Sequence, residues 1–383
     1  RHMLFLEDGE MAELTRDGAR VETLDGQRVE RAPRRVDWSP VQAEKGGYKH
    51  FMLKEIYEQP TAVENTLRGR ILLEEGDLVD AELGLDPERA RRIQRVVLVA
   101  CGTSYHACLA GRYWIEQLAR VPATAEVASE VRYRDPVFAE GDLVVAVSQS
   151  GETADSLAAV RAAQDAGAEV LAVANVLDSA IPRLADGSLY THAGPEIGVA
   201  STKCFTAQLV ALLMLAVYLG RRRGRLDADA TREILQSLVE VPAAIRTCLE
   251  HRDDVLQVAR RWQHAEHMLF LGRGLGFAVA LEGALKLKEI SYAHAEGYAA
   301  GEMKHGPIAL IDADMPVVVV IPRDRHYDKT LSNVQEVLAR DGQVIAVCSG
   351  DDERVGSLVP FVLRVPTVAD LVLPLVTVIP LQL

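Results

Sequence analysis

The stretch LVVAVSQSGET, residues 143–153, is the most informative part of this sequence. Its five leading apolar residues are typical of a strand that is buried on both faces of a parallel sheet. The apolar run stops at Ser148 and a helical pattern follows Thr153, so the turn between them brings hydroxyl groups and free backbone N–H groups to the start of a helix. Ligands bind at such strand ends in open α/β sheets. We therefore predict an α/β fold with a phosphate site at residues 148–153.

Composition limits the classes of protein to which the chain can belong. Its 383 residues are 49% hydrophobic and 25% charged, as in globular proteins with large cores. A net charge of −13 argues against a nucleic-acid partner, because such a partner requires a basic face. The longest helix-like apolar stretch, residues 209–219, is too short to cross a bilayer. The five cysteines lack metal-ligand spacing and suit reduced thiols, so we expect a cytoplasmic protein with no membrane partner.

Strand-like and helix-like segments alternate from residue 95 onward, a pattern that predicts mostly parallel sheets flanked by helices. Predicted strands lie at residues 96–100, 124–127, 143–147 and 170–173. Similar strand segments recur roughly 170 to 174 residues later, at residues 268–272, 317–320 and 341–347. We therefore predict two copies of one α/β domain, at residues 76–226 and 227–383. A helical stretch over residues 227–260 would join them.

The first 36 residues differ from the rest of the chain. Asp-Gly pairs stand at residues 8–9, 17–18 and 25–26. They separate short β-prone pieces, which predicts hairpins. Because so few residues cannot form a stable core alone, we interpret residues 1–36 as a short β remnant, the end of a domain whose body is missing. Residues 37–75 are predicted to be a linker followed by a first helix that begins near Lys49.

Hydroxyl residues open two further helices of the first α/β domain. The strand at residues 96–100 ends in Cys101-Gly102-Thr103-Ser104, and the segment GVASTK, residues 198–203, precedes a long apolar helix. Ser or Thr at a helix start is often only an N-cap that satisfies free N–H groups. Three such starts in one domain, each beside a glycine, favour a shared anion site instead. The spacing fits neither a P-loop nor a dinucleotide-binding fingerprint.

A charged stripe lies on a predicted helix of the second domain, residues 277–292. Glu282, Lys286 and Glu289 stand at i, i+4 and i+7 on this otherwise apolar helix. Such a stripe is often a solvated face with weak ion pairs, but a carboxylate beside an ammonium in a cleft can also transfer protons. His305 follows in a predicted loop, where its ring could reach a ligand or simply be exposed. We find no zinc, calcium or Ser-His-Asp pattern and expect no metal and no cofactor.

Several motifs, taken together, point to a known family. They are CGTS (101–104), SQSGET (148–153), EIGVASTK (196–203) and ALEGALKLKEI (280–290). In order and spacing they closely resemble glutamine–fructose-6-phosphate aminotransferase, also called glucosamine-6-phosphate synthase. Further similarity at residues 54–60 and 299–307 extends the resemblance over almost the whole chain. Members of the family join a glutaminase to an isomerase module of two sugar isomerase (SIS) domains, which makes glucosamine 6-phosphate from fructose 6-phosphate.

This resemblance implies a fold and a role for each candidate residue. The fold would be two tandem SIS domains, each a mostly parallel sheet flanked by helices, after the β remnant. The residues implied to bind the substrate are Thr103, Ser104, Ser148, Gln149, Ser150, Thr153, Val199 and Ser201. Glu289 would move a proton between C1 and C2 of the sugar, and Lys286 would lie beside it. His305, from the neighbouring subunit of a homodimer, would assist ring opening.

The resemblance also implies parts that this chain lacks. Residues 1–36 would be the last strands of the glutaminase domain, whose body and cysteine nucleophile are absent, so glutamine hydrolysis is not expected. The chain stops at Leu383, where the family continues into a tail with a Schiff-base lysine, so we expect impaired turnover. The expected ligands are fructose 6-phosphate and glucosamine 6-phosphate. Alternatives are another SIS-family sugar-phosphate isomerase or deglycase, or a non-catalytic sugar-phosphate sensor, although the sequence shows no basic recognition helix.

Overall fold

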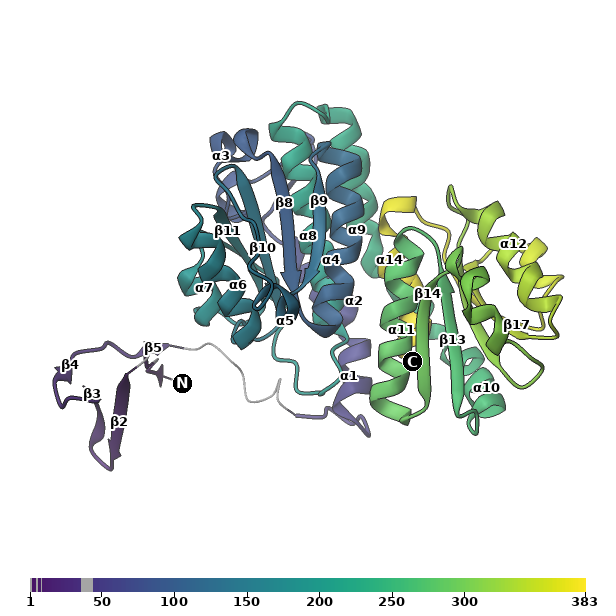
Figure 1. The fold of residues 1–383 in the computed structure, drawn as a ribbon, viewed down its shortest axis with the longest axis horizontal. Helices are drawn as coiled ribbons and strands as arrows, with labels where there is room; N and C mark the ends of the chain where they lie inside the picture. The colour runs from purple at the N-terminus through teal and green to yellow at the C-terminus, as the bar shows by residue number, and fades with distance from the viewer. Residues whose placement is uncertain (1, 5, 8, 36–43) are drawn as a thin grey trace. The chain divides into compact units, whose positions relative to one another are not determined.

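The computed structural model describes residues 2–4, 6–7, 9–35 and 44–383 (Figure 1). The chain divides into two compact units, Arg1–Glu44 and Lys45–Leu383. The predicted boundary between residues 36 and 37 lies outside the described residues. That boundary therefore stays a prediction.

The smaller unit consists of short antiparallel strands. Its strands are β1 (His2–Met3), β2 (Glu10–Thr15), β3 (Gly18–Thr23), β4 (Arg28–Val29) and β5 (Arg34–Arg35). They pair in the order β2-β3-β4, and β1 pairs with β5. Gly9 and Gly26 have φ angles of 85° and 86°, in the left-handed region that glycine adopts at little cost. The hairpins predicted at residues 17–18 and 25–26 are confirmed, whereas the pair at residues 8–9 includes a residue outside the described part of the chain and stays a prediction.

The first sheet of the larger unit is parallel, with the strand order β12-β11-β10-β8-β9. Its strands are β8 (Arg95–Ala100), β9 (Ala123–Val127), β10 (Asp142–Ser148), β11 (Glu169–Ala174) and β12 (Gly187–Tyr190). Every residue of β10 is buried. Alternate side chains point to opposite faces of the sheet, and both faces are covered. Val145 and Val147 pack in one apolar cluster, while Val144 and Ala146 pack in another. The predicted strand at residues 143–147 is confirmed.

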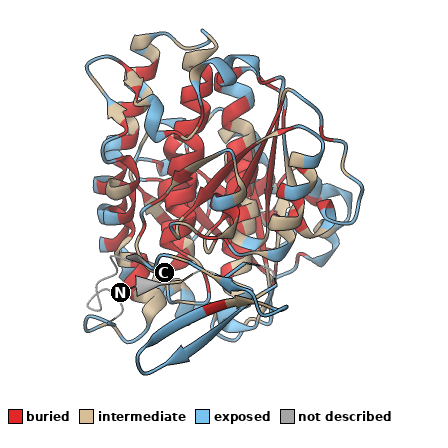
Figure 2. Ribbon diagram, turned by 90° about the vertical axis from the view of Figure 1, so that its left-hand side faces the viewer, coloured by how far each residue is buried: buried red, intermediate tan, exposed pale blue. Residues whose placement is uncertain are grey.

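Helices cover both faces of this sheet, and the strands between them are almost continuously buried (Figures 1 and 2). The helices are α4 (Gly102–Trp114), α5 (Ala128–Val131), α6 (Ala154–Asp165), α7 (Ala180–Leu184) and α8 (Lys203–Arg222). α4 and α8 pack on one face, and α6 and α7 on the other. α4 begins at Gly102, so Thr103 and Ser104 lie inside its first turn.

Helix α8 corrects one prediction. The apolar stretch at residues 209–219 is part of a helix of 20 residues, so the prediction that it is too short to cross a membrane is wrong. Within the described part of the chain, α8 is the one helix with the length and composition of a membrane span. Its apolar window is nevertheless entirely buried against protein. An apolar helix that is covered on all sides is typical of the core of a large domain.

The second sheet repeats the first. It has the parallel order β14-β13-β15-β16-β17. Its strands are β13 (His267–Gly272), β14 (His294–Ala299), β15 (Pro316–Ile321), β16 (Gln343–Ser349) and β17 (Phe361–Val365). When this order is read backwards, β15 stands where β10 stands in the first sheet, and β13 stands where β8 stands. The predicted fold of two mostly parallel sheets flanked by helices is confirmed.

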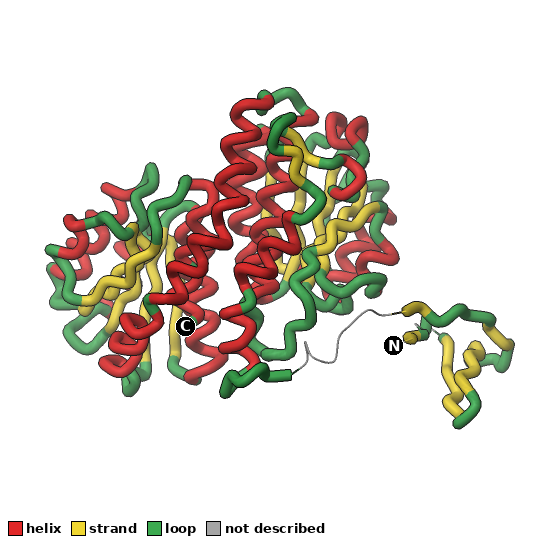
Figure 3. The backbone as a smooth tube through the Cα atoms, turned by 180° about the vertical axis from the view of Figure 1, so that it is seen from behind, coloured by secondary structure: helices red, strands yellow, loops and turns green. Residues whose placement is uncertain are grey.

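Helix α11 (Leu275–Ser291) connects the two halves of the larger unit, because it packs both on β13 and β14 and on α4. Figure 3 shows helices standing between the two sheets. The remaining helices of this half are α9 (Ala228–Glu250), α10 (Arg252–Trp262), α12 (Tyr327–Leu338), α13 (Glu353–Gly356), α14 (Leu373–Thr377) and α15 (Ile379–Gln382). The predicted helical stretch at residues 227–260 is thus two helices. The domain boundary between residues 226 and 227 stays a prediction.

The first part of the larger unit packs against these helices. It comprises α1 (Phe51–Tyr57), α2 (Gln59–Leu67), α3 (Pro87–Arg92) and the short strands β6 (Ile71–Leu72) and β7 (Asp77–Leu78). α2 packs on α8 and α9. In α1, Lys54 and Glu55 are buried along with Ile56. The buried Glu55 carboxylate requires hydrogen-bond donors, and the backbone N–H groups of Ile197 and Gly198 supply them.

Candidate functional site

The ends of β8 and β10 meet at one edge of the first sheet, because these two strands are neighbours. A cavity of about 250 Å³ opens there. All the residues implied to bind the substrate line it: Thr103, Ser104, Ser148, Gln149, Ser150, Thr153, Val199 and Ser201. Cys101, Val147, Glu196 and Gly198 complete its lining. Three segments that are far apart in the sequence therefore form one hydroxyl-rich cavity.

The loop after β10 is shaped by its own hydroxyl groups. The backbone N–H of Gly151 donates to Ser148 Oγ at 3.0 Å, and Ser148 Oγ lies 3.1 Å from Thr153 Oγ1. Gly151 has a φ angle of 67°, and a Cβ atom there would lie 1.9 Å from Ser179 Oγ. The turn therefore requires glycine at this position. We name this loop, residues 148–153, the cradle.

The hydroxyl-rich helix starts do not act as simple N-caps. The cap positions of α4, α6 and α8 are Cys101, Thr153 and Thr202, and none of these three side chains makes a cap hydrogen bond. The alternative in which these hydroxyls serve only to cap their helices is therefore wrong. At α8 the Glu196 carboxylate accepts the N–H groups of Thr202 and Cys204 instead. Uncapped N–H groups at a helix N-terminus, as at α6, favour an anion.

Two of the three side chains in the charged stripe of α11 are buried, and the third is exposed to solvent. Glu282 is fully buried and Lys286 is 2% exposed, whereas Glu289 is partly exposed. Lys286 Nζ lies 2.6 Å from Glu289 Oε2 and 3.4 Å from Glu282 Oε1. It also donates to Thr103 Oγ1 of α4 at 3.0 Å. The alternative of a solvated face is wrong for Glu282 and Lys286, and Thr103 joins this cluster to the cavity.

Comparison with known proteins identifies the family. A family model described as "SIS domain" matches residues 91–218 and 263–383. The glutamine–fructose-6-phosphate aminotransferase (isomerizing) of Thermus thermophilus is 51% identical over 383 residues, which are all of this chain and 63% of that protein. The C-terminal domain of glucosamine-fructose-6-phosphate aminotransferase from Francisella tularensis has a TM-score of 0.81 at 44% identity, over 88% of this chain and 95% of that chain. This chain belongs to that aminotransferase family.

The similarity to other SIS proteins is weaker. A putative phosphosugar isomerase from Silicibacter pomeroyi is 28% identical, with a TM-score of 0.70 over 87% of this chain and 94% of that one. The aminotransferase of Chlorobaculum tepidum is 49% identical over 381 residues. The chain spans about 62% of the length of the curated aminotransferases that it matches. These identities favour the aminotransferase family over the alternative of another sugar-phosphate isomerase.

His305 lies away from the cavity. It ends a short 3-10 helix, Glu302–His305, and it is exposed to solvent. It is not among the residues that line the cavity, and neither are Lys286 and Glu289, which reach the lining only through the hydrogen bond from Lys286 to Thr103. In the aminotransferase family the resemblance implies that this histidine comes from a second subunit. That role stays a prediction.

Two carboxylates that sequence reasoning did not select hold the loop at residues 196–201. Glu55 of α1 is 2% exposed and accepts the backbone N–H groups of Ile197 at 2.6 Å and Gly198 at 3.1 Å. Burial raises the pKa of the Glu55 carboxyl. Glu196 accepts the N–H of Thr202 at 2.8 Å. The segment KEIYEQP, which contains Glu55, belongs to the family resemblance and is the one signal that could have indicated it.

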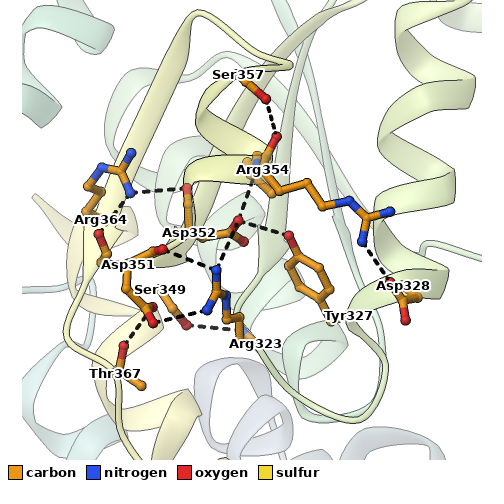
Figure 4. Close-up of polar contacts among 12 residues, drawn as sticks. Arg323, Tyr327, Asp328, Ser349, Asp351, Asp352, Arg354, Ser357, Arg364 and Thr367 are labelled. Carbon is orange, nitrogen blue, oxygen red and sulfur yellow. Dashed lines mark hydrogen bonds and ion pairs between the residues drawn. The ribbon is translucent and has the colours of Figure 1, made fainter.

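At the corresponding strand ends of the second sheet, charged and hydroxyl side chains pair with one another (Figure 4). Arg323, after β15, pairs with Asp351 after β16 at 3.1 Å, and its backbone N–H donates to Ser349 Oγ at 3.0 Å. Asp352 is fully buried and accepts the Tyr327 hydroxyl at 2.9 Å. Burial and the Asp352 carboxylate raise the pKa of Tyr327 to about 12. We name these residues the closed network.

The site gives no structural indication of a metal. Among the described residues, no group of three or more His, Cys, Asp or Glu side chains is arranged to hold one. Cys101 is the one cysteine in the cavity lining, and burial raises the pKa of its thiol. A thiol with a raised pKa is a poor nucleophile. The hydroxyl groups of the lining are suited to anion binding, and the α11 cluster is suited to proton transfer.

Proposed function

We propose that this chain is the isomerase part of a glutamine–fructose-6-phosphate aminotransferase, which converts fructose 6-phosphate and ammonia into glucosamine 6-phosphate. The observation that carries the proposal is that every residue implied to bind the substrate lines one cavity, with Lys286 and Glu289 joined to it through Thr103. Relatives of that name are 49% and 51% identical to the chain. The cradle would then bind the 6-phosphate.

The lining explains how an acidic protein can bind a dianion. Hydroxyls predominate among the polar side chains of the cavity, and α6 begins directly after Thr153 with free N–H groups. Hydrogen bonds from hydroxyls and helix N-terminal amides favour a phosphate without a long-range basic field. Free fructose would lack these contacts, so we expect the cavity to discriminate by the phosphate.

The reaction that we propose balances as follows. Ammonia adds to the C2 carbonyl of fructose 6-phosphate and water leaves, which forms an imine at C2. The Glu289 carboxylate removes a proton from C1 and returns it to C2, while the C1 hydroxyl loses its proton and the nitrogen gains one. The products are glucosamine 6-phosphate and water. Lys286, 2.6 Å from Glu289, would keep that carboxylate oriented between the two transfers.

Further parts of the proposal concern partners. We propose that the chain works as a cytoplasmic homodimer in which His305 of a second copy assists ring opening. The ammonia would come from a glutaminase domain like the one that the family name implies. The smaller unit, with its antiparallel strands, would be the edge of such a domain.

Binding can be tested by thermal unfolding with fructose 6-phosphate, glucosamine 6-phosphate and free fructose. A ligand at one hundred times its dissociation constant should stabilise the folded state by about 2.7 kcal/mol. We expect both phosphorylated sugars to raise the melting temperature and free fructose to leave it unchanged. Ser150→Ala should weaken the response. Equal shifts with fructose and fructose 6-phosphate would show that the cradle does not bind phosphate.

Turnover can be tested on the complete natural protein with Glu289→Gln. The variant keeps the size of the side chain but cannot accept a proton, so formation of glucosamine 6-phosphate should fall by roughly 10²- to 10⁴-fold. Its binding of fructose 6-phosphate should remain. Unchanged turnover would show that Glu289 is not the base.

A further inference from the structure

His106 is a partly buried histidine beside the proposed catalytic cluster, and no role has been assigned to it. It lies on α4, three residues after Thr103, so both side chains project from one face of that helix. This face packs on α11 (Figure 1). The His106 side chain is 13% exposed, and it does not line the cavity. Its hydrogen-bond partner lies on α11 and, like Lys286 and Glu289, is not among the lining residues.

The neighbour of His106 is the carboxylate of Glu282. His106 Nδ1 lies 2.8 Å from Glu282 Oε2, and the Thr103 hydroxyl donates to Glu282 Oε1 at 3.1 Å. Glu282 is fully buried, and a buried carboxylate is stable only when its oxygens receive hydrogen bonds or charges. An ionised carboxylate can only accept, so Nδ1 of His106 must carry the hydrogen. Each oxygen of Glu282 thus receives a donor from α4.

Lys286 connects Glu282 to the proposed base. An ammonium has three hydrogens, and Lys286 Nζ has three acceptors: Thr103 Oγ1 at 3.0 Å, Glu289 Oε2 at 2.6 Å and Glu282 Oε1 at 3.4 Å. How closely the ammonium of Lys286 approaches each acceptor depends on how strongly Glu282 attracts it. A Glu282 without its histidine donor would draw Lys286 toward itself and away from Glu289. The hydrogen bond from His106 opposes that displacement.

We propose that His106 is a positioning residue for the proton transfer: its Nδ1–H satisfies Glu282 across the domain interface and so keeps Lys286 beside Glu289. The inference rests on the proposed function of Glu289. It predicts a defect in turnover rather than in binding, because the cradle lies on another strand end and shares no hydrogen bond with His106. It also predicts that any side chain with an N–H at the Nδ1 position can replace the histidine.

The test uses the complete natural protein and three variants, His106→Ala, His106→Asn and His264→Ala. The asparagine amide nitrogen can take the place of histidine Nδ1, whereas alanine has no donor. His264 is exposed and serves as the matched histidine-to-alanine control. The kcat and KM for fructose 6-phosphate are measured for each, together with the exchange of the C1 hydrogen of fructose 6-phosphate with D2O.

We expect His106→Ala to lower kcat and C1 exchange by roughly 10- to 100-fold, a part of what a positioned base contributes, with KM unchanged within about twofold. His106→Asn should recover most of the rate, and His264→Ala should equal the parent. In a Glu282→Gln background the further change to His106→Ala should have little effect, because the two residues act through one hydrogen bond. A stabilisation by fructose 6-phosphate that equals the parent's would show that the alanine variant is folded.

Three results would overturn the inference while leaving the proposed function intact. They are a parental kcat in His106→Ala, a raised KM with unchanged kcat, and equal loss of rate in the alanine and asparagine variants. The first result would show that His106 has no role in turnover. The second would place His106 in substrate binding, and the third would show that the N–H donor is not what His106 contributes. If instead the parent protein neither binds fructose 6-phosphate nor exchanges its C1 hydrogen, the proposed function fails first.

Discussion

The cradle and the closed network occupy equivalent strand ends of two sheets with the same topology, yet they differ in what fills the space. In the first sheet the loop after β10 presents hydroxyls to a cavity of about 250 Å³. In the second sheet the guanidinium of Arg323 crosses from the end of β15 to Asp351. The first arrangement leaves hydrogen-bonding groups for a ligand. In the second, the charged groups pair mainly with one another (Figure 4), although Asp352 Oδ2 has no hydrogen-bond partner among the described residues.

This difference shows that the fold provides the position of a site and the side chains decide whether one exists. Strand ends of an α/β sheet are suited to ligands because helix N-termini converge there. At the equivalent position of the second sheet, the Arg323 guanidinium already occupies the Asp351 carboxylate, which is then not available to a ligand. The substitutions below separate the two regions, since changes in the cradle should affect ligand binding and changes in the closed network should affect stability alone.

The largest effect is expected for Gly151→Ala in the cradle. The new Cβ would lie 1.9 Å from Ser179 Oγ, and the φ angle of 67° is unfavourable for alanine. We expect the free energy of unfolding to fall by about 3 kcal/mol and the response to fructose 6-phosphate to be lost. Urea denaturation with and without the sugar phosphate measures both. Gly350→Ala is the matched control, because its Cβ would meet only Val365 O at 3.4 Å.

Asp352→Ala in the closed network should have the next largest effect. The substitution removes the acceptor of the Tyr327 hydroxyl and the carboxylate that caps α13 through the N–H of Val355. We expect a loss of about 2 kcal/mol in the free energy of unfolding, with an unchanged affinity for fructose 6-phosphate. Calorimetric unfolding and titration of the sugar phosphate check the two parts. A loss of affinity would contradict the separation of the two regions.

The two serines at the strand ends give a matched pair with a smaller effect. Ser148 accepts the N–H of Gly151 and Ser349 accepts the N–H of Arg323, and both are buried. Each alanine substitution should cost about 1 kcal/mol in stability. Only Ser148→Ala should also weaken fructose 6-phosphate binding, by about tenfold or more, because its hydroxyl belongs to the cavity lining. Equal affinities for the two variants would refute the assignment of the cradle.

The smallest effect is a pH dependence from Glu55. Burial raises the pKa of its carboxyl in the folded protein above the ordinary value of 4.5, so the folded state binds this proton more tightly than the unfolded state. The contribution of Glu55 to stability is therefore present below the unfolded pKa and is lost as the pH rises through the folded pKa. The stability of the parent relative to Glu55→Gln should fall as the pH rises above the ordinary carboxyl pKa of 4.5. Urea denaturation of both proteins at several pH values tests this. A stability of the parent relative to Glu55→Gln that rises with pH would contradict the raised pKa of Glu55.

Much of the fold follows from local pattern. Runs such as Leu143 to Val147 can be predicted as strands because continuous apolar residues occur where both faces of a sheet are covered. The recurrence of these runs predicts the repeat. The length of α8 could not be predicted from its most apolar part, because Lys203, Thr206 and Gln208 in its first turns are polar in sequence but buried by packing. Partners that lie far away in the chain set that burial.

The candidate site, too, could be predicted from the sequence only in part. The hydroxyls of the cradle can be predicted, since a strand, a turn with glycine and a helix start are adjacent in sequence. The burial of Glu282 and Lys286 cannot, because a solvated stripe and one packed on another helix have the same period. His106 gave no signal of its own, since a single histidine in a helix has no characteristic spacing. Only the packing of α4 on α11 brings it to Glu282.

The sequence by itself therefore determined the α/β class, the repeat and the family resemblance, and it predicts the hydroxyl-rich turn at residues 148–153. These depend on short-range periodicity and turn chemistry. The tertiary structure decided which hydroxyls share one cavity, that Thr103 bonds to the α11 cluster, and that the second sheet's strand ends are closed by Arg323. The physical reason is that burial and hydrogen bonding between distant segments depend on helix packing, which residue spacing along one segment does not encode.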